Sequence, residues 1–241
     1  MSSLVITLDG PAASGKGTLA RALGHRFNLA VLDTGLLYRL VGLACHRAGV
    51  DPHDAVAATR IAEQMAARLT LAQLDHRDLR GVEASRAASV YSAIPGVRSA
   101  LTAFQRDFAA SPPAFLDGHP ASGAILDGRD CGTVICPAAP LKFYIIADVS
   151  ERAHRRLRDL ESRGITADYE SVLNDLMVRD HRDMTRAVAP TVAADDAITM
   201  DTTGRSVDAL VDELGAYVEA KLHLARDASS GTITPHDTVR E

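Results

Sequence analysis

Short apolar runs alternate with helical stretches along most of this chain. Residues 4–8 (LVITL) are apolar and rich in β-branched side chains, and residues 9–11 (DGP) follow them directly. This pattern is typical of a buried strand that ends in a turn. Further on, Leu19, Leu23 and Phe27 recur at the spacing of one helix face. The start of the chain therefore predicts a strand, a turn and a helix, in that order.

The same alternation continues toward the C-terminus. Further strands are predicted at about 30–32, 124–126, 141–147 and 197–200, and further helices at about 35–48, 150–162, 168–185 and 205–222. Each predicted strand is apolar throughout, which is typical of a parallel sheet covered by helices on both faces. The pattern thus predicts an α/β fold.

A long helical stretch interrupts this alternation. Between about 51 and 108 the apolar positions keep helical spacing and indicate no strand, which favours an inserted helical subdomain. Residues 109–123 are rich in Ala, Ser, Pro and Gly, a composition typical of a loop. Because 226–241 contains few apolar residues, we expect a single domain over 1–225 followed by a disordered tail.

Composition narrows the class of protein. Of the 241 residues, 46% are hydrophobic and 24% charged, which excludes a wholly disordered, collagen-like or coiled-coil chain. No apolar run approaches 18 residues and the first residues do not resemble a signal peptide, so we expect no membrane association. The net charge of −5 argues against a nucleic-acid partner but permits a small anionic ligand held by local cations.

The cysteines indicate a reducing environment. Cys45, Cys131 and Cys136 cannot all pair with one another, and they form no Cys-x-x-Cys motif. A zinc site is therefore not expected, and a cytoplasmic location is favoured.

One segment matches a phosphate-binding pattern. Residues 10–16 (GPAASGK) fit G-x-x-x-x-G-K and lie between the first predicted strand and the first predicted helix. Glycines in such a loop let backbone N–H groups converge on phosphate oxygens, and the helix N-terminus adds positive potential. The lysine, Lys16, reaches the β- and γ-phosphates. The alternative interpretation is a glycine-rich turn with a surface lysine.

The residue after Lys16 departs from the usual pattern. Gly17 stands where a Ser or Thr commonly ligates Mg²⁺, and the hydroxyl comes one place later, at Thr18. Thr18 is expected to cap a phosphate or to act as a displaced metal ligand, with Mg²⁺ held mainly by phosphate oxygens and water.

Polar residues also open the second predicted helix. In residues 33–39 (DTGLLYR), Thr34 and Tyr38 share one helix face, and Arg39 lies one residue beyond. We interpret Arg39 as a phosphate clamp. The alternative is a helix cap at Asp33 and an arginine exposed on the surface.

A second polar cluster, residues 127–130 (DGRD), follows the strand predicted at 124–126. Ligands of open parallel sheets bind at the carboxyl ends of strands, so two aspartates and an arginine there indicate a charged ligand. Asp127 resembles the acidic residue that faces Mg²⁺ through water in phosphate-loop enzymes. The alternative is an ordinary polar turn, and the nearby cysteines are interpreted as packing residues.

Arginines gather between residues 150 and 190. Four lie on one predicted helix, at positions 152, 155, 156 and 158. Arg179, Arg182, Asp183 and Arg186 follow the spacing i, i+3, i+4, i+7 and so share one face of the next helix. The stretch holds as many acidic residues as arginines, so surface ion pairs are an equal alternative to ligand binding.

Four motifs, taken together, resemble the cytidylate kinase (CMP/dCMP kinase) family of bacteria. They are LDGPAASGKGT at 8–18, LDTGLLYR at 32–39, DGRDCGTVICP at 127–137 and RDHRDMTRAVAP at 179–190. They occur in the family's order, and a weaker likeness extends over about 3–222. Four motifs in order are much more specific than the phosphate loop alone.

The resemblance implies a phosphate-loop NTPase fold of the nucleoside monophosphate kinase type. Its five-stranded parallel sheet has helices on both faces, a helical acceptor-binding insertion at about 51–108 and a short lid at about 150–165. It implies a monomeric enzyme of pyrimidine nucleotide metabolism that uses Mg²⁺. ATP would donate its γ-phosphoryl group to CMP or dCMP, without a general base.

The resemblance also carries residue roles for the donor nucleotide. The ATP phosphate loop comprises Gly10, Pro11, Ala12, Ala13, Ser14, Gly15, Lys16, Gly17 and Thr18. The lid arginines expected at ATP are Arg152, Arg155 and Arg158. Catalytic roles are expected for Lys16, Arg129 and Arg156, and Asp127 would face the metal through water.

For the acceptor nucleotide, the resemblance matches the following residues: Thr34, Tyr38, Arg39, Ser89, Arg98, Arg129, Asp130, Arg179, Asp183 and Arg186. Ser89, Arg98 and Asp130 match positions that read the cytosine edge. Arg39 and Arg129 match phosphate contacts, and Arg179 with Asp183 matches the pair at the sugar hydroxyls.

One region departs from the family pattern. Many members carry a strand-rich hairpin that residues 68–80 are too short to hold, which leaves the preference among CMP, dCMP and UMP open. Two alternative functions also stay open: another small phosphate-loop kinase, acting on shikimate, gluconate or a different nucleotide, and a nucleotide-binding switch that does not turn over.

Overall fold

Five parallel strands form the centre of the protein, whose computed structural model describes residues 4–230. The strands are β1 (Leu4–Asp9), β2 (Leu29–Asp33), β3 (Gly123–Asp127), β4 (Leu141–Ile146) and β5 (Ile198–Asp201). Their order across the sheet is β2-β3-β1-β4-β5, and every neighbouring pair is parallel. The prediction of a five-stranded parallel sheet is therefore confirmed.

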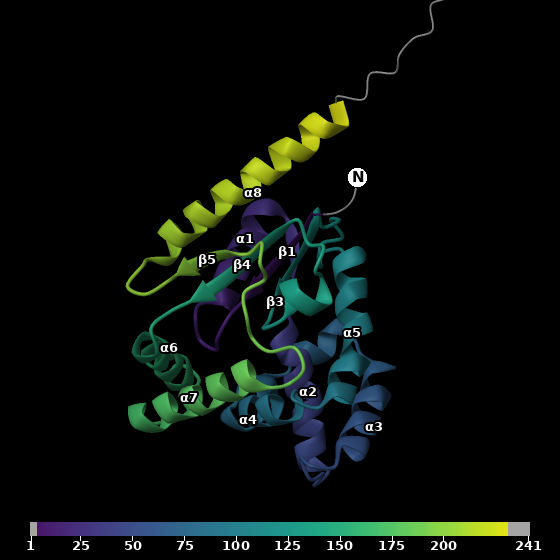
Figure 1. Cartoon of the computed structure of the whole chain (residues 1–241), viewed down its shortest axis with the longest axis vertical. Helices are drawn as coiled ribbons and strands as arrows, with labels where there is room; N and C mark the ends of the chain where they lie inside the picture. The colour runs from purple at the N-terminus through teal and green to yellow at the C-terminus, as the bar shows by residue number, and fades with distance from the viewer. Residues whose placement is uncertain (1–3, 231–241) are drawn as a thin grey trace, which may run out of the picture.

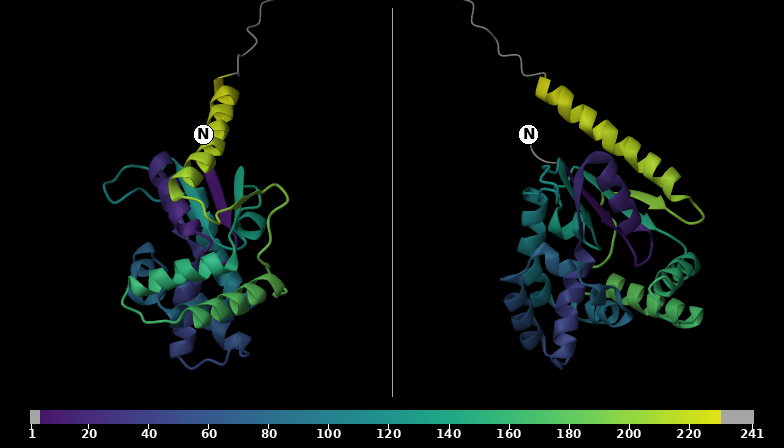
Figure 2. Two further views of the ribbon diagram at one scale, coloured as in Figure 1. Left: turned by 90° about the vertical axis from the view of Figure 1, so that its left-hand side faces the viewer. Right: turned by 180° about the vertical axis from the view of Figure 1, so that it is seen from behind.

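Helices cover both faces of this sheet (Figures 1 and 2). On one face, α1 (Lys16–Phe27) and α8 (Val207–Ser230) pack side by side. Leu19 and Leu23 of α1 and Leu214 of α8 join Phe143 of β4 in one apolar core. On the other face, α2 (Thr34–Arg47) and α5 (Pro95–Ala110) pack against β3 in a second core. Burial on both faces explains why the strands are mostly apolar.

The stretch between residues 51 and 108 is helical, as its periodicity predicted, and contains no strand. It consists of α3 (Ala55–Ala66), two short 3₁₀ helices, Leu71–Asp75 and Arg77–Arg80, then α4 (Val82–Tyr91) and most of α5. α4 packs along α2, which places it beside the carboxyl ends of the strands.

Two further helices, α6 (Val149–Glu161) and α7 (Tyr169–Thr185), pack against each other below the sheet in Figure 1. Residues 150–165, which the resemblance predicts to be a lid, form most of α6 and the turn after it. α7 also contacts α4, so these helices surround the same end of the sheet.

The structure differs from the predicted elements at two places. α8 continues to Ser230, so residues 226–230 are helical although the disordered tail was expected to begin at 226. Residues 231–241 lie outside the described part of the chain. Cys131–Ile135 forms a π-helical turn that the apolar pattern did not indicate, because one short irregular turn has no repeating period.

None of the helices within residues 4–230 is both long enough and apolar enough to span a bilayer.

Candidate active site

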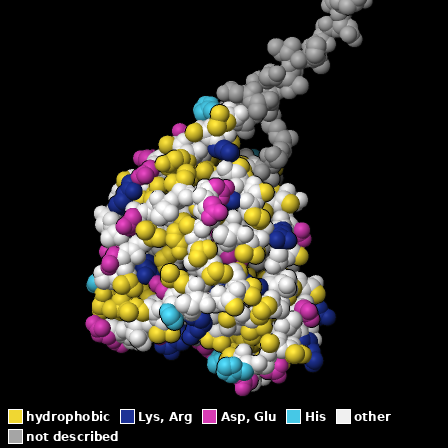
Figure 3. All heavy atoms as spheres, viewed as in Figure 1, with side chains coloured by type: hydrophobic (Ala, Val, Ile, Leu, Met, Phe, Trp, Pro, Cys, Tyr) yellow, Lys and Arg dark blue, Asp and Glu magenta, His cyan; other side chains and the backbone are white. Residues whose placement is uncertain are grey.

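A cleft of about 840 Å³ opens at the carboxyl ends of the strands. The phosphate loop and the starts of α1 and α2 form one wall, and α4, α6 and α7 contribute the others. Arginines from all five of these helices line it, whereas acidic and basic side chains are interspersed over the outer face shown in Figure 3. The cleft is therefore a local concentration of positive charge in a protein with a net charge of −5.

The phosphate loop curls back on its own lysine. Lys16 is 4% exposed, and its Nζ donates hydrogen bonds to the Pro11 carbonyl at 2.7 Å and to Ser14 Oγ at 3.2 Å. Gly10 has a φ of +137°, and a Cβ there would lie 2.1 Å from the Ile145 carbonyl oxygen, so only glycine fits. Burial, and then the nearby Arg129 cation, lower the pKa of Lys16. An anion in the cleft would reverse that shift.

Seven of the nine predicted loop residues line the cleft, namely Ala12, Ala13, Ser14, Gly15, Lys16, Gly17 and Thr18. Gly10 and Pro11 do not line it, because they form the connection between β1 and the rest of the loop. Their contribution is through the backbone, since the Pro11 carbonyl accepts the hydrogen bond from Lys16.

Three aspartates stand at the ends of three adjacent strands. Asp33 of β2 is in register with Asp127 of β3, and Asp9 ends the neighbouring β1. Asp9 is buried, and its carboxylate accepts hydrogen bonds from the backbone N–H groups of Cys131 at 2.8 Å and Gly132 at 2.7 Å. Asp9 thus holds the π-helical turn against the sheet. Sequence reasoning missed this role, although a charge at the end of a buried strand was a usable signal.

Asp127 is the aspartate best placed to serve a metal. Burial raises its pKa, while the Lys16 ammonium opposes that rise. A Cβ on Gly17 would lie 3.2 Å from Asp127 Oδ2, so the carboxylate sits directly over the start of α1. Thr18 is exposed in the same cleft.

These residues fit Mg²⁺, which prefers oxygen ligands and often uses one or two carboxylates together with substrate phosphates and water. No cluster of three or more His, Cys, Asp and Glu side chains that could hold a metal occurs among the described residues. The donors present thus suit an ion bound together with a phosphate ligand.

Three arginines predicted for the acceptor side face the same cleft as Lys16. Arg39 Nη1 donates to the Leu79 carbonyl at 2.8 Å, and burial, with repulsion from neighbouring arginines, lowers its pKa to about 9. Arg129 and Arg179 share one carboxylate: their Nε atoms lie 3.4 and 3.5 Å from Asp183 Oδ2. The cations therefore outnumber the acidic partners around them.

A narrow recess of about 30 Å³ adjoins the cleft and shares Gly35, Arg129 and Arg179 with it. Arg98 and Asp130 form a buried ion pair there, and the Arg98 guanidinium lies 5.0 Å from the centre of the Tyr38 ring. The other predicted residues in its walls are Thr34, Asp183 and Arg186. The Thr34 hydroxyl donates to the Asp127 carbonyl at 2.9 Å.

Three polar atoms of the side chains that line this recess lack hydrogen-bond partners. The Tyr38 hydroxyl, Arg129 Nε and Arg186 Nη2 are buried and make no hydrogen bond to the described residues. Buried polar groups in folded proteins are nearly always paired, so unpaired ones facing a recess indicate a polar ligand.

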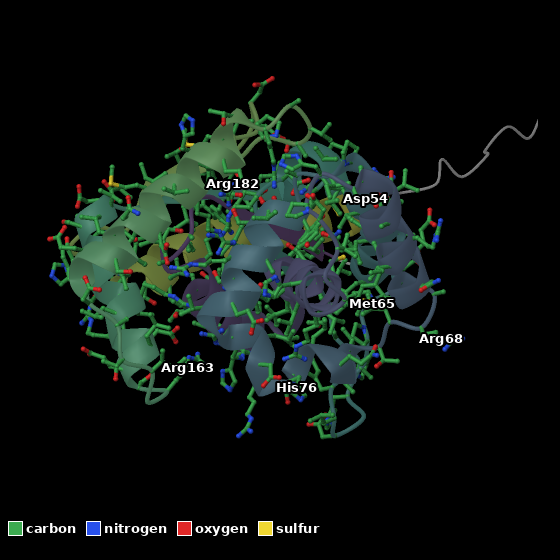
Figure 4. The ribbon with its side chains drawn as sticks, turned by 90° about the horizontal axis from the view of Figure 1, so that it is seen from below. Asp54, Met65, Arg68, His76, Arg163 and Arg182 are labelled. Carbon is green, nitrogen blue, oxygen red and sulfur yellow. The ribbon has the colours of Figure 1, made fainter. Side chains whose placement is uncertain are left out.

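Ser89 was predicted with Arg98 and Asp130, but it lines the main cleft rather than the recess. Its hydroxyl accepts a hydrogen bond of 2.8 Å from Arg182 Nη1. Figure 4 labels Arg182 on α7 near the middle of the molecule, whereas Arg163 lies toward its edge. Arg182 was absent from the predicted site, although its helical spacing from Arg179 was visible in the sequence.

The four arginines of α6 separate into two groups. Arg155 and Arg156 line the cleft. Arg152 is buried behind the loop, where it donates to the Ala12 and Ala147 carbonyls and pairs with Asp180 at 2.6 Å. Arg158 is exposed and its Nε donates to a carbonyl of its own helix.

This geometry gives no support to the predicted ATP-binding roles of Arg152 and Arg158. Successive arginines on one helix point in different directions, and only those turned toward the phosphate loop reach the cleft. Arg152 instead braces the loop against α7.

A family model and individual known proteins match most of this chain. A family model described as cytidylate kinase matches residues 6–220. A cytidylate kinase from Paramagnetospirillum magneticum is 50% identical over 206 residues, which is 86% of this chain and 93% of that protein. One from Rhodospirillum rubrum is 52% identical over 200 residues, 83% and 90% of the two chains.

A crystal structure of an uncharacterized protein from Eubacterium ventriosum matches with a TM-score of 0.51 at 14% identity, covering 90% of this chain and 99% of that one. That likeness shows the fold alone. The family match and the two relatives cover most of the chain, and so this protein belongs to the cytidylate kinase family of phosphotransferases.

Proposed function

We propose that this protein transfers the γ-phosphoryl group of ATP to the phosphate of CMP or dCMP, giving ADP and CDP or dCDP. The observation that carries this proposal is that the phosphate loop with Lys16 and the acceptor-side arginines line one cleft. Two nucleotides bound end to end there would bring their phosphates together between these cations.

The reaction needs no general base. The acceptor phosphate has a second pKa near 6, so near neutral pH its attacking oxygen already carries a negative charge. A bond forms between that oxygen and the γ-phosphorus, while the bond from the γ-phosphorus to the bridging oxygen of ADP breaks. Catalysis then consists of in-line positioning and of neutralising the charge on the equatorial oxygens.

The cations of the cleft suit this task. Lys16 would hold the β- and γ-phosphates. Their negative charge would raise the pKa of Lys16, which burial lowers, and so favour the ammonium form. Arg39 and Arg129 would grip the acceptor phosphate, since a guanidinium fork holds two oxygens in fixed geometry. Arg155 and Arg156 enter the cleft from α6 and would contact the donor phosphates.

Mg²⁺ would be held on the protein side by Asp127 through water, with Thr18 close by. When bound with ATP, it would neutralise part of the phosphate charge and polarise the transferred group. Burial raises the pKa of Asp127, and a divalent cation beside the carboxylate would oppose that rise.

The recess and its surroundings would take the nucleoside. Arg98, Asp130 and Ser89 would read the base, Arg179 and Asp183 the sugar, and Thr34, Tyr38 and Arg186 would complete the contacts.

A coupled assay for ADP release tests the proposal with ATP and CMP, dCMP, UMP, AMP or shikimate as acceptors. We expect CMP and dCMP to give by far the highest kcat/KM. Turnover with shikimate or AMP alone would show instead that the protein is another phosphate-loop kinase. Tight ATP binding without turnover on any acceptor would indicate a nucleotide-binding switch.

We also propose that the enzyme acts as a monomer in the cytoplasm. All three cysteines, which lie within the described residues, are free thiols, which accords with a reducing compartment. Light scattering after gel filtration checks the oligomeric state, with a mass near 25.6 kDa expected.

A further inference from the structure

Each acceptor-side arginine of the cleft is restrained by an uncharged oxygen. The pairs are Arg39 with the Leu79 carbonyl at 2.8 Å, Arg129 with the Gly128 carbonyl at 2.9 Å and Arg179 with the Ser85 hydroxyl at 2.8 Å. Two of the three acceptors belong to the backbone. Ser85 is the one that belongs to a side chain, and nothing in the sequence pattern assigned it a role.

These arginines need restraint because they repel one another. Burial and the neighbouring arginine cations lower the pKa of Arg39 and of Arg179. Long, flexible side chains under such repulsion would spread apart and lose a fixed geometry. The Asp183 carboxylate lies near both Arg129 and Arg179, but a carboxylate also offsets part of the charge that an anionic ligand needs. A hydroxyl or carbonyl orients the guanidinium and leaves its charge available.

Arg179 is held from two directions. On its own helix, α7, its Nε lies 3.5 Å from Asp183 one turn away, and across the cleft its Nη1 donates to Ser85 on α4. Its side chain is 16% exposed, and Arg179 lines both the cleft and the recess. Without Ser85, the only restraint left among the described side chains is Asp183, which is itself shared with Arg129.

We propose that Ser85 is a positioning residue that fixes Arg179 for the sugar of the acceptor nucleotide and thereby sets the preference for ribose over deoxyribose. This inference rests on the proposed function, in which Arg179 and Asp183 face the sugar. CMP carries a 2′-hydroxyl that dCMP lacks. A misaligned Arg179 therefore weakens the binding of CMP more than the binding of dCMP.

Steady-state kinetics of Ser85→Ala test this. We expect KM for CMP to rise about three- to tenfold, the change expected from losing one net hydrogen bond. The KM for dCMP should rise less, and KM for ATP and kcat should change less than twofold. A general loss of folding would lower the active fraction and hence kcat, without changing the ratio of the two acceptors.

Two variants serve as controls. Ser85→Thr keeps the hydroxyl and should restore KM for CMP to within about twofold of wild type. Glu83→Gln alters the same helix on its exposed side, where Glu83 pairs with His46 at 3.3 Å, and should leave the CMP to dCMP ratio unchanged.

A wild-type KM for CMP in Ser85→Ala, an equal rise for CMP and dCMP, or no rescue by Ser85→Thr would each overturn the inference. These results differ from failure of the proposed function, in which the wild-type protein itself would not phosphorylate CMP.

Discussion

Arg98 and Asp130 form an ion pair that is almost completely buried, with 7% and 6% of their side chains exposed. Arg98 lies on α5, and Asp130 lies just before the π-helical turn, 32 residues later. Arg98 Nη1 also donates to the Ser92 carbonyl at 3.2 Å. Two charges buried together stabilise each other, and removing one leaves the other without its partner.

Asp130→Asn should therefore lower the free energy of unfolding by about 3–5 kcal/mol, measured by urea denaturation. Adding Arg98→Met should recover part of that loss, because no lone charge is then buried. Activity with CMP should stay low in both variants. If the free energy of unfolding of Asp130→Asn lies within about 1 kcal/mol of the wild-type value, this pair contributes little to stability.

Lys16→Met should reduce kcat by about 10²–10⁴-fold with little loss of stability, as expected for removing a preorganised charge from the transferred group. Burial disfavours the charged form of Lys16. Replacing this side chain should therefore change the free energy of unfolding little. Lys221→Met, on α8 and outside the cleft, is the matched control. Turnover at the wild-type rate in Lys16→Met would remove this lysine from catalysis.

Arg39→Ala should raise KM for CMP at least tenfold and KM for ATP less than twofold, because the guanidinium faces the acceptor side of the cleft. The measurement is initial rates with one substrate varied and the other saturating. Equal effects on both KM values would contradict its placement on the acceptor phosphate.

Arg155→Ala should raise KM for ATP about three- to tenfold, since Arg155 lines the cleft and its Nη1 lies 3.4 Å from the Ser14 carbonyl of the phosphate loop. Arg158→Ala removes the same charge from the same helix at an exposed position and should leave KM for ATP unchanged. A larger rise in KM for ATP with Arg158→Ala than with Arg155→Ala would instead support the prediction that Arg158 binds ATP.

Asp9 makes the stability depend on pH. Burial raises its pKa from the ordinary 3.8 to about 6. Between these values the folded protein keeps a proton that the unfolded chain has released, so the contribution of Asp9 to the free energy of unfolding falls as pH rises from about 4 to 6. The fall is on the order of 2–3 kcal/mol.

Asp9→Asn cannot titrate, so comparing it with wild type isolates this contribution. The wild-type free energy of unfolding minus that of the variant should decrease between pH 4 and pH 6 and level off above. A difference that stays constant or grows over this range would contradict the assignment.

Local features could be predicted from the sequence because each is encoded in a short continuous segment. Residues 10–16 match a phosphate-binding pattern in one continuous segment, and their strand and helix follow from apolar spacing on either side. The same holds for the strands, which are mostly apolar because helices cover both faces of the sheet. The shared helix face of Arg179 and Asp183 was likewise legible, because one helical turn relates them.

Only the tertiary structure decided which of these residues meet. The Ser85–Arg179 hydrogen bond joins residues 94 apart, and the Asp9–Cys131 bond joins residues 122 apart. Nor could the sequence distinguish Arg155 in the cleft from Arg152 behind the loop, because the rotation of α6 is set by its packing against α7 and the loop. Spacing along a chain determines which side chains share a face, but only packing determines what that face touches.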